Sequence, residues 1–308
     1  MPRLFAVLRT LLRCRPRTLL QLIAWSNERG KPTILTHRTP HGTFSGVRND
    51  YLFEQAIKNG INEPHFLDLI TKILNPDDVA LDLGANIGTH SILLSHQLSQ
   101  GEVIAFEPQA LSFSILQSNI LSNRSTNIKA YRFACSDKEN DVVSMQPPDV
   151  IGENVNIGNT RVDTTGFAWD FVLTKTVDGL ELDRLDFIKL DIQGSETKAL
   201  KGAAETIRRF RPYLFVEIEN LHLQALGSSA TDLIELILSH GYALYRFETS
   251  YPCDHVCVPL ENVAEFEAKF SEKDGVPLSA RIEGSRVELS YDKDNLNIYS
   301  FIKVAPDG

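Results

Sequence analysis

Short apolar segments alternate with stretches of helical periodicity along most of this chain, and no other feature constrains its fold as strongly. Residues 213–219 hold five apolar residues in seven, whereas 195–210 repeats apolar residues at the spacing of a single helix. Strands that are apolar on both sides belong to a parallel sheet covered by helices on both faces. The sequence therefore predicts a doubly wound, mostly parallel seven-stranded α/β sheet, with strands at 79–84, 102–107, 128–134, 186–192, 213–219 and 243–248 and an antiparallel one at 255–260.

We expect this sheet to form one domain over residues 33–260. Residues 1–32 are predicted to form a basic helical segment, and residues 261–308 an acidic helix followed by a β-hairpin. Four cysteines in 308 residues, without a C-x-x-C pair, favour neither a disulfide framework nor structural zinc. A reducing cytoplasm is therefore the expected compartment.

The net charge of −9 is unevenly distributed along the chain. Residues 1–50 carry nine Lys and Arg against Glu28 and Asp50, a balance of +7, and the remaining residues carry 22 basic and 38 acidic ones, a balance of −16. Because nucleic-acid binding depends largely on phosphate neutralisation, the acidic body argues against a nucleic-acid partner. The basic start suits three alternatives: peripheral contact with an anionic membrane, packing on the main domain, or a mitochondrial presequence.

Polar residues cluster where the predicted strands end. The first strand ends in Asp82-Leu83-Gly84-Ala85-Asn86-Ile87-Gly88, and the second ends at Glu107. Two glycines allow a tight turn close to a ligand, but the pattern is not the G-x-G-x-x-G of dinucleotide binding. Asp82 would repel a pyrophosphate and attract a sulfonium or ammonium group. A carboxylate at Glu107 can accept both hydroxyls of a ribose. Together these residues favour a nucleoside ligand with a cationic group.

The sequence resembles the FkbM-type S-adenosylmethionine-dependent methyltransferases, which have the Rossmann-like class I methyltransferase fold. The matching segments include DLGANIGTHS (82–91), AFEP (105–108), ACSD (134–137) and TVDGLELDRLDFIKLDIQGSETKALKGA (176–203). The resemblance implies that Asp82, Gly84, Asn86 and Gly88 surround the methionine part of S-adenosyl-L-methionine, that Glu107 binds its ribose, that Ser136 and Asp137 lie by its adenine, and that Asp191 lies beside the transferable methyl group. Gln193 departs from the family, which often has Glu there.

Methyl transfer to a hydroxyl requires a positioned group that accepts its proton. The candidate catalytic residues are Asp191 at the end of the fourth strand, Glu217 at the end of the fifth and His222 just beyond it. Lys189 needs a partner in its apolar strand, and we expect Glu196 or Glu217 to supply it. Asp191 and Glu217 alternatively suit a divalent cation, but the sequence offers no third fixed ligand, so we predict no metal site.

The sequence thus favours a methyltransferase that modifies a hydroxyl of a sugar, glycolipid or secondary metabolite. A nicotinamide-dependent oxidoreductase and a non-catalytic nucleoside-binding protein are the two rival interpretations. The missing G-x-G-x-x-G disfavours the first, and the polar residues at several strand ends disfavour the second. The oligomeric state does not follow from the sequence.

Overall fold

The computed structural model describes most of the chain, and the statements below concern these residues only. The described residues are 33–61, 63–148, 150, 155–164, 170–247, 249, 253–270, 282, 287–292, 294, 296 and 299–303. The predicted basic segment 1–32 lies outside them. Among the described residues, none of the helices combines the length and apolar character that a membrane span requires.

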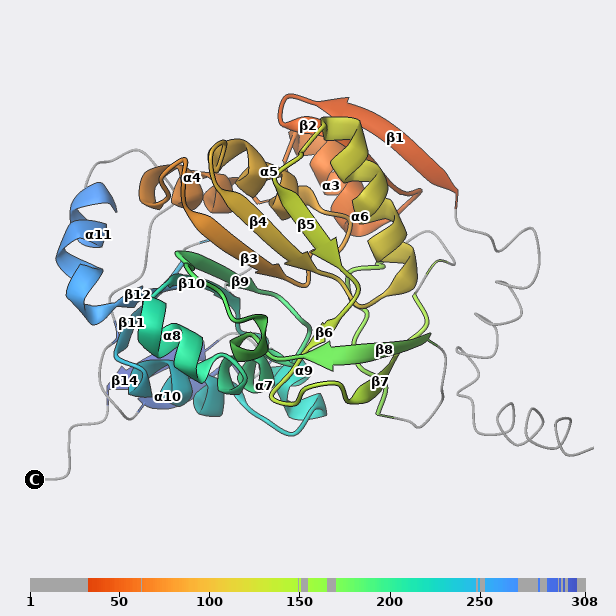
Figure 1. Ribbon diagram of the computed structural model, residues 1–308. Helices are drawn as coiled ribbons and strands as arrows, with labels where there is room; N and C mark the ends of the chain where they lie inside the picture. Colours follow the sequence, from red (N-terminus) through yellow and green to blue (C-terminus); the bar gives the residue numbers. More distant parts are fainter. Residues whose placement is uncertain are drawn as a thin grey trace, which may run out of the picture.

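A seven-stranded sheet forms the centre of the protein, which confirms the predicted doubly wound α/β fold (Figure 1). Its order is β11-β12-β10-β9-β3-β4-β5, and β12 alone runs antiparallel to its neighbours. The chain fills the β3-β4-β5 side first and then crosses to β9 on the other side of β3. Ligands of such sheets bind at the strands' carboxyl ends near this reversal. The strands are β3 (Val79–Leu83), β4 (Glu102–Phe106), β5 (Ile128–Tyr131), β9 (Phe187–Leu190), β10 (Tyr213–Glu217), β11 (Tyr242–Arg246) and β12 (Asp254–Pro259).

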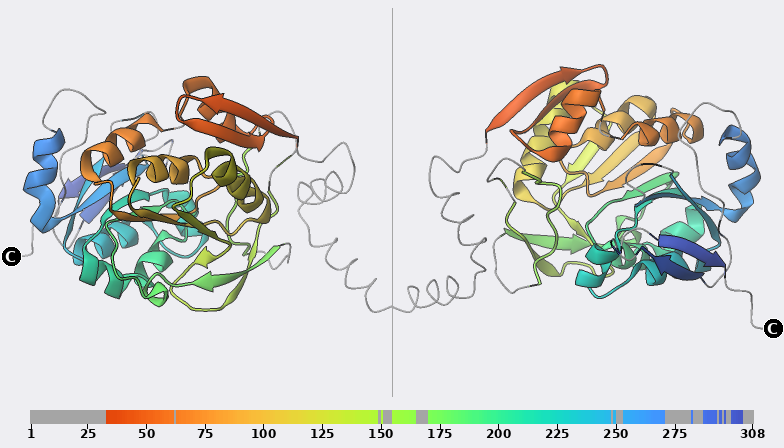
Figure 2. Two further views of the ribbon diagram at one scale, coloured as in Figure 1. Left: turned by 45° about the horizontal axis from the view of Figure 1, so that its top comes forward. Right: turned by 180° about the vertical axis from the view of Figure 1, so that it is seen from behind.

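Helices cover both faces of the sheet, as Figures 1 and 2 show. Ala80 and Phe215 pack into one hydrophobic cluster, whereas Leu81 and Leu214 pack into the other, because successive side chains of a strand point to opposite faces. The first cluster involves α4 (Pro64–Ile73), α5 (Thr89–Gln97), α6 (Ala110–Asn123) and α11 (Val263–Phe270). The second involves α7 (Glu196–Lys201), α8 (Ala204–Phe210), α9 (Asn220–Ala225) and α10 (Ala230–Ser239).

The single helix predicted over 195–210 is wrong, because α7 and α8 are separate. A Cβ atom on Gly202 would lie 2.2 Å from the carbonyl oxygen of Ser136, so the backbone passes this point at close range. Asp178 then accepts the backbone N–H of Thr206 at 2.8 Å and caps the start of α8. The apolar spacing continues across the break, which is why periodicity did not reveal it.

Smaller elements surround the carboxyl edge of the sheet. An antiparallel hairpin, β1 (Ile34–Thr39) and β2 (Gly42–Val47), leads into α3 (Tyr51–Asn59). Asp50 caps α3 and also accepts the backbone N–H of Ile157 at 2.9 Å, which fixes the loop 155–164 beside this helix. The remaining elements are a small sheet of β6 (Ala134–Cys135), β7 (Val142–Met145) and β8 (Asp170–Lys175), the 3-10 turns η2 (Asp178–Leu180) and η3 (Leu260–Asn262), and a hairpin of β13 (Val287–Tyr291) and β14 (Tyr299–Lys303).

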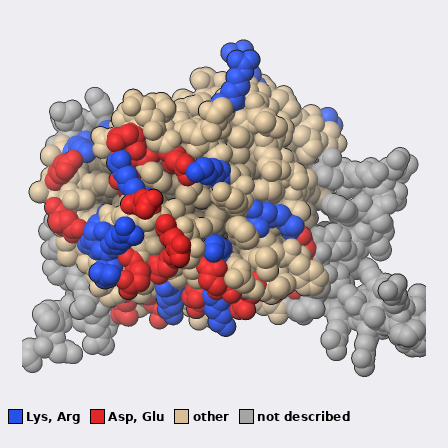
Figure 3. Space-filling view, viewed as in Figure 1, with Lys and Arg blue, Asp and Glu red and all other residues tan. Residues whose placement is uncertain are grey.

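Charged side chains of both signs intermingle on the face shown in Figure 3. They gather over the part of the molecule where α8 and α10 lie in Figure 1. Among the described residues of this face, no patch of one sign dominates. This face therefore lacks the basic stripe that a nucleic-acid backbone would require.

Candidate active site

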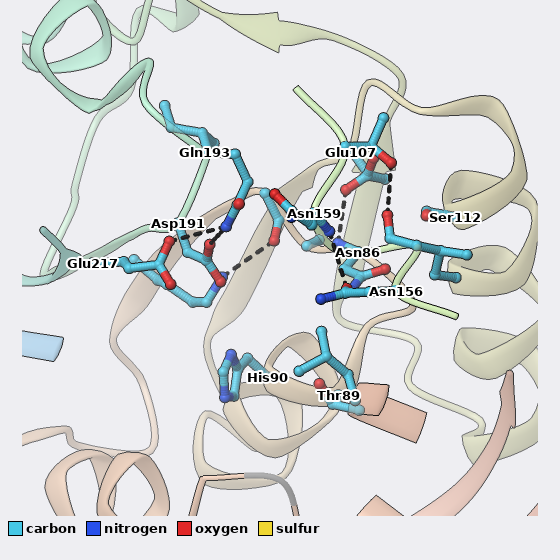
Figure 4. Close-up of a pocket in the computed structure, with 18 of the residues that line it drawn as sticks. Asn86, Thr89, His90, Glu107, Ser112, Asn156, Asn159, Asp191, Gln193 and Glu217 are labelled. Atoms are coloured by element: carbon cyan, nitrogen blue, oxygen red, sulfur yellow. Dashed lines mark hydrogen bonds and ion pairs between the residues drawn. The ribbon is translucent and has the colours of Figure 1, made fainter. Parts of the chain in front are cut away.

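A cavity of about 660 Å³ opens at the carboxyl ends of β3, β4, β9 and β10. This volume lies within the ordinary range of small-molecule sites. Six of the predicted site residues line the cavity: Gly84, Asn86, Glu107, Asp191, Glu217 and His222. Figure 4 shows two polar groups of side chains in it, with Glu107 and Asn86 in one and Asp191, Gln193 and Glu217 in the other.

The turn after β3 requires its two glycines. Gly84 has φ +83°, and a Cβ atom there would lie 1.8 Å from the carbonyl oxygen of Asp191. Gly88 has φ +90° and precedes α5, where a Cβ atom would lie 2.5 Å from Leu116 Cδ1. The left-handed backbone and the close contact both exclude a side chain. Gly84 thereby lets the turn pack directly on the end of β9, next to Asp191.

Glu107 is held rigidly at the end of β4. Its Oε2 accepts the backbone N–H of Asn86 and its Oε1 accepts that of Gln109, each at 2.8 Å. Burial raises the pKa of Glu107 to about 7, although the two hydrogen bonds oppose this shift. The buried Oδ1 atom of Asn86 has no hydrogen-bond partner among the described residues. Both side chains therefore present acceptor oxygens to the cavity.

Lys189 is almost completely buried, with 1% of its surface exposed. Its Nζ lies 3.2 Å from Asp82 Oδ1 and 3.5 Å from Asp191 Oδ2, and it donates a hydrogen bond to the carbonyl oxygen of Gly84 at 3.1 Å. The expectation that Glu196 or Glu217 pairs with Lys189 is therefore wrong. Burial lowers the pKa of Lys189, but the surrounding carboxylates outweigh burial and raise it. The ammonium ion links the glycine turn to both aspartates.

Four of the predicted donor-binding residues do not line the cavity. Asp82 is completely buried and accepts a hydrogen bond from Ser91 Oγ at 2.5 Å. Its carboxylate, which we expected beside the ligand, is thus paired with Ser91 and Lys189. Ser136 Oγ donates a hydrogen bond to Asp137 Oδ1 at 3.2 Å. Both residues follow Cys135, which does line the cavity. Gly88 acts through the backbone of the turn. The roles of these four residues toward the donor stay predictions, and the structure places their side chains outside the cavity lining.

Gln193 joins the two carboxylates at the other polar group. Its Nε2 donates to Asp191 Oδ1 at 3.0 Å and to Glu217 Oε2 at 2.9 Å, as drawn in Figure 4. Burial and the negative charge of Asp191 raise the pKa of Glu217 well above its usual value. Burial also acts to raise the pKa of Asp191, but the charge of Lys189 together with the hydrogen bonds from Glu217 and Gln193 outweighs it, and the pKa is lowered. A glutamate at position 193 has no amide to donate to both carboxylates, so glutamine suits this position.

His222 lies on α9, a short helix that the periodicity did not predict. Its side chain is buried, and its Nδ1 lies 3.0 Å from Glu219 Oε2. Burial lowers the pKa of His222, while Glu219 acts in the opposite direction. The imidazole therefore faces the cavity in its neutral form.

Among the polar residues that line the cavity and that the sequence did not single out, three are ionisable groups close to one another. Glu63 precedes α4, His65 lies on this helix, and Asp254 begins β12. His65 Nε2 lies 2.8 Å from Asp254 Oδ2, and Glu63 Oε2 lies 3.2 Å from His90 Nε2. Asp254 was open to prediction, because an antiparallel strand begins at the edge where its parallel neighbours end. Glu63 carries no comparable sequence signal.

Comparison with known proteins identifies the family. Residues 82–244, slightly more than half of the chain, match the family described as the Methyltransferase FkbM domain. This chain belongs to the FkbM methyltransferase family. All six predicted residues that line the cavity lie within the matched FkbM region, whereas Glu63, His65 and Asp254 lie outside it.

Two curated relatives are methyltransferases. The hexuronic acid methyltransferase AglP of Haloferax volcanii is 29% identical over 163 residues, which cover 51% of this chain and 62% of AglP. The methyltransferase sdnD of Sordaria araneosa is 25% identical over 181 residues, which cover 49% of this chain and 69% of sdnD. A solved methyltransferase FkbM from Methylobacillus flagellatus KT is 21% identical with a TM-score of 0.44, and the alignment covers 60% of this chain and 44% of that one. The chain thus spans less than two thirds of the length of AglP.

Proposed function

We propose that this FkbM domain transfers a methyl group from S-adenosylmethionine to a hydroxyl oxygen of a sugar, glycolipid or secondary metabolite. The observation that carries the proposal is the buried carboxylate of Glu107 at the end of β4, oriented by two backbone N–H groups beside the glycine turn. An acceptor in this position suits the two hydroxyls of a ribose.

The donor end of the cavity fits a nucleoside. Each oxygen of Glu107 accepts one backbone N–H and retains lone pairs for a ribose hydroxyl. Phe133, Ala134 and Cys135 supply an apolar wall that suits an adenine ring. The orphaned Oδ1 of Asn86 supplies a further acceptor. These features support S-adenosylmethionine more than a dinucleotide, because the turn lacks G-x-G-x-x-G.

S-adenosylmethionine supplies a methyl group on a sulfonium: an O–C bond forms, the C–S bond breaks with its electron pair going to sulfur, and the acceptor hydroxyl loses its proton. Orientation of donor and acceptor provides most of the rate enhancement in such a displacement. Asp191, Glu217 and His222 are the candidates for taking the proton. We favour Asp191, because it contacts the glycine turn through Lys189 and its carboxylate is held by Gln193.

The nature of the acceptor is supported by the polar lining and by one relative. Asn156, Asn159 and Thr160 of the loop 155–164 line the cavity together with the carboxylates described above. Such a lining suits a ligand with many hydroxyl groups. AglP is named for a hexuronic acid, and we take hexuronic acids and related sugars as the first acceptors to test.

Calorimetric titration of the purified protein with S-adenosylhomocysteine, with NADH in parallel, tests the donor assignment. We expect micromolar binding of S-adenosylhomocysteine alone. Binding of NADH instead would favour an oxidoreductase, and binding of neither would favour a non-catalytic protein. Turnover is then measured with a panel of hexuronic and neutral hexose glycosides, and Asp191→Asn should lower it about 10²–10⁴-fold while the donor affinity stays close to that of the wild type.

A further inference from the structure

Two carboxylates and one imidazole converge at the carboxyl end of β10. Glu217 ends the strand, Glu219 directly precedes α9, and His222 lies in the first turn of that helix. Their potential ligand atoms all lie within 4.8 Å of one another, and all three residues line the cavity. A bound Zn²⁺ or similar ion draws such ligand atoms to about 2.0–2.2 Å from itself. Small side-chain rotations would therefore complete a site.

The local fold explains this convergence. Residues two apart at the end of an extended segment point to the same side, which brings Glu217 and Glu219 together. Residues three apart on a helix are also neighbours, which brings His222 next to Glu219. A Glu-x-x-His spacing on a helix is one that holds metal ions inside helix bundles. The segment Glu217-Ile218-Glu219-Asn220-Leu221-His222 thus supplies three ligands within six residues.

The imidazole of His222 gives a second, independent observation. The side chain is 11% exposed, and its Nδ1 makes no hydrogen bond to a described residue. Glu219 Oε2 lies 3.0 Å from Nδ1, but in a direction that does not form a hydrogen bond. A buried ring nitrogen without a hydrogen bond is energetically unfavourable unless another group binds it. A cation between the imidazole and the carboxylates meets this requirement.

The charges around the site also favour a cation. Asp191, Glu63 and Asp254 line the same cavity as the two glutamates, whereas Lys189 is the cation that lines it among the described residues. Arg161 also lies close enough to His222 to lower the pKa of its imidazole. An acidic sugar placed among these carboxylates would be repelled, unless a divalent ion lies between them.

We propose that Glu217, Glu219 and His222 bind a divalent cation of the Mn²⁺ or Zn²⁺ type. One imidazole with two carboxylates suits these ions better than Ca²⁺ or Mg²⁺, which prefer oxygen ligands alone. Within the proposed methyltransferase function, on which this part of the inference rests, the ion holds adjacent hydroxyls or a carboxylate of the acceptor. The prediction of no metal site from the sequence lacked the third ligand that the structure places at His222.

A second cluster, whose potential ligand atoms lie equally close together, provides the internal control. Glu63, His65 and Asp254 also bring their ligand atoms within 4.8 Å of one another. However, His65 Nε2 already bonds to Asp254 at 2.8 Å, and Glu63 pairs with His90 at 3.2 Å. Because the imidazole of that cluster already hydrogen-bonds to its aspartate, whereas His222 Nδ1 makes no hydrogen bond to a described residue, we assign the ion to the His222 cluster.

The test is calorimetric titration of Mn²⁺, and separately Zn²⁺, into the full chain after treatment with a chelator. We expect one ion per chain, and we expect His222→Gln and Glu219→Gln each to weaken binding by about tenfold or more. His65→Gln should change the affinity less than about twofold. S-adenosylhomocysteine affinity is measured on every sample, and its retention shows that each variant is folded.

Two results would overturn the metal site: wild-type protein that binds neither ion below millimolar concentration, or affinity that falls in His65→Gln but not in His222→Gln. Because the readout is ion binding without methyl transfer, it is independent of the proposed donor. Protein that binds Mn²⁺ but not S-adenosylhomocysteine would retain the metal site and refute the methyltransferase proposal.

Discussion

Replacement of Glu107 by glutamine tests the donor site directly. The two carboxylate oxygens accept separate backbone N–H groups, that of Asn86 on Oε2 and that of Gln109 on Oε1. A glutamine has one acceptor oxygen, so one of these N–H groups would face an amide NH₂. The same substitution removes the negative charge and one of the acceptors proposed for the ribose hydroxyls.

The magnitude follows from these contacts. A hydrogen bond to a charged group contributes about 1.5–3 kcal/mol, and about 1.4 kcal/mol corresponds to a tenfold change in affinity. Glu107→Gln should therefore weaken S-adenosylhomocysteine binding by about 10- to 150-fold. Glu107→Ala, which removes both oxygens, should weaken it by more than about tenfold as well. Calorimetric titration at fixed ionic strength measures both values.

The same site predicts how binding depends on pH. Burial raises the pKa of Glu107 to about 7, so this carboxyl is protonated in the free protein below that pH. Ribose hydroxyls donate to the ionised form, and donor binding should therefore tighten as pH rises from 6 to 8 and level off above. In Glu107→Gln this dependence should disappear, because no carboxyl titrates.

Glu196→Gln is the matched control. Glu196 is also a buried glutamate whose pKa burial raises to about 7, and it also accepts two backbone N–H groups, but its side chain does not line the cavity. Donor affinity in Glu196→Gln should equal that of the wild type. An unchanged affinity in Glu107→Gln, or an equal loss in both variants, would refute the assignment of Glu107 to the ribose.

Three further predictions concern stability and membrane contact. Lys189→Met leaves the fully buried Asp82 without its cation, so the free energy of unfolding in urea should fall by about 3–5 kcal/mol, and a fall of less than about 1 kcal/mol would contradict the pairing. Both backbone N–H groups that Glu196 accepts bond to its Oε1, so a glutamine oxygen can keep both hydrogen bonds. Because the pKa of Glu196 is raised to about 7 in the folded protein, the stability of the wild type falls between pH 4.5 and 7. Thermal denaturation should therefore show that Glu196→Gln is more stable than the wild type at pH 8, by at most about 3 kcal/mol, but not at pH 4. If the basic N-terminal segment binds membranes, deletion of residues 1–25 should abolish sedimentation with anionic vesicles, and an intact chain that stays in the supernatant would end that hypothesis.

The strands of the central sheet were predictable because they are buried on both faces. All seven predicted segments contribute a strand to one sheet, and a segment such as residues 103–106 is apolar at every position because both faces of the sheet are covered. The helices were less predictable. The break between α7 and α8 depends on the close approach of Gly202 to Ser136, and α9 is too short for periodicity to reveal.

The strand ends were likewise predictable as a group. Parallel strands bring their carboxyl ends to one edge, so Gly84, Glu107, Asp191 and Glu217 had to lie near one another once the fold was correct. The pairing of these polar groups with one another was not predictable from the sequence. Lys189 contacts Asp82 rather than a glutamate, because the register pairs Asp82 directly with Lys189 across β3 and β9.

The sequence by itself therefore determined the fold, the family and the edge of the sheet that carries the site, because hydrophobic periodicity and local motifs encode these features within short stretches. Only the tertiary structure decided that Asp82 is buried behind Lys189 and that Glu63 and His65 enter the cavity. These contacts depend on how separate elements pack and on the direction of individual side chains. No residue spacing along a single chain records that information.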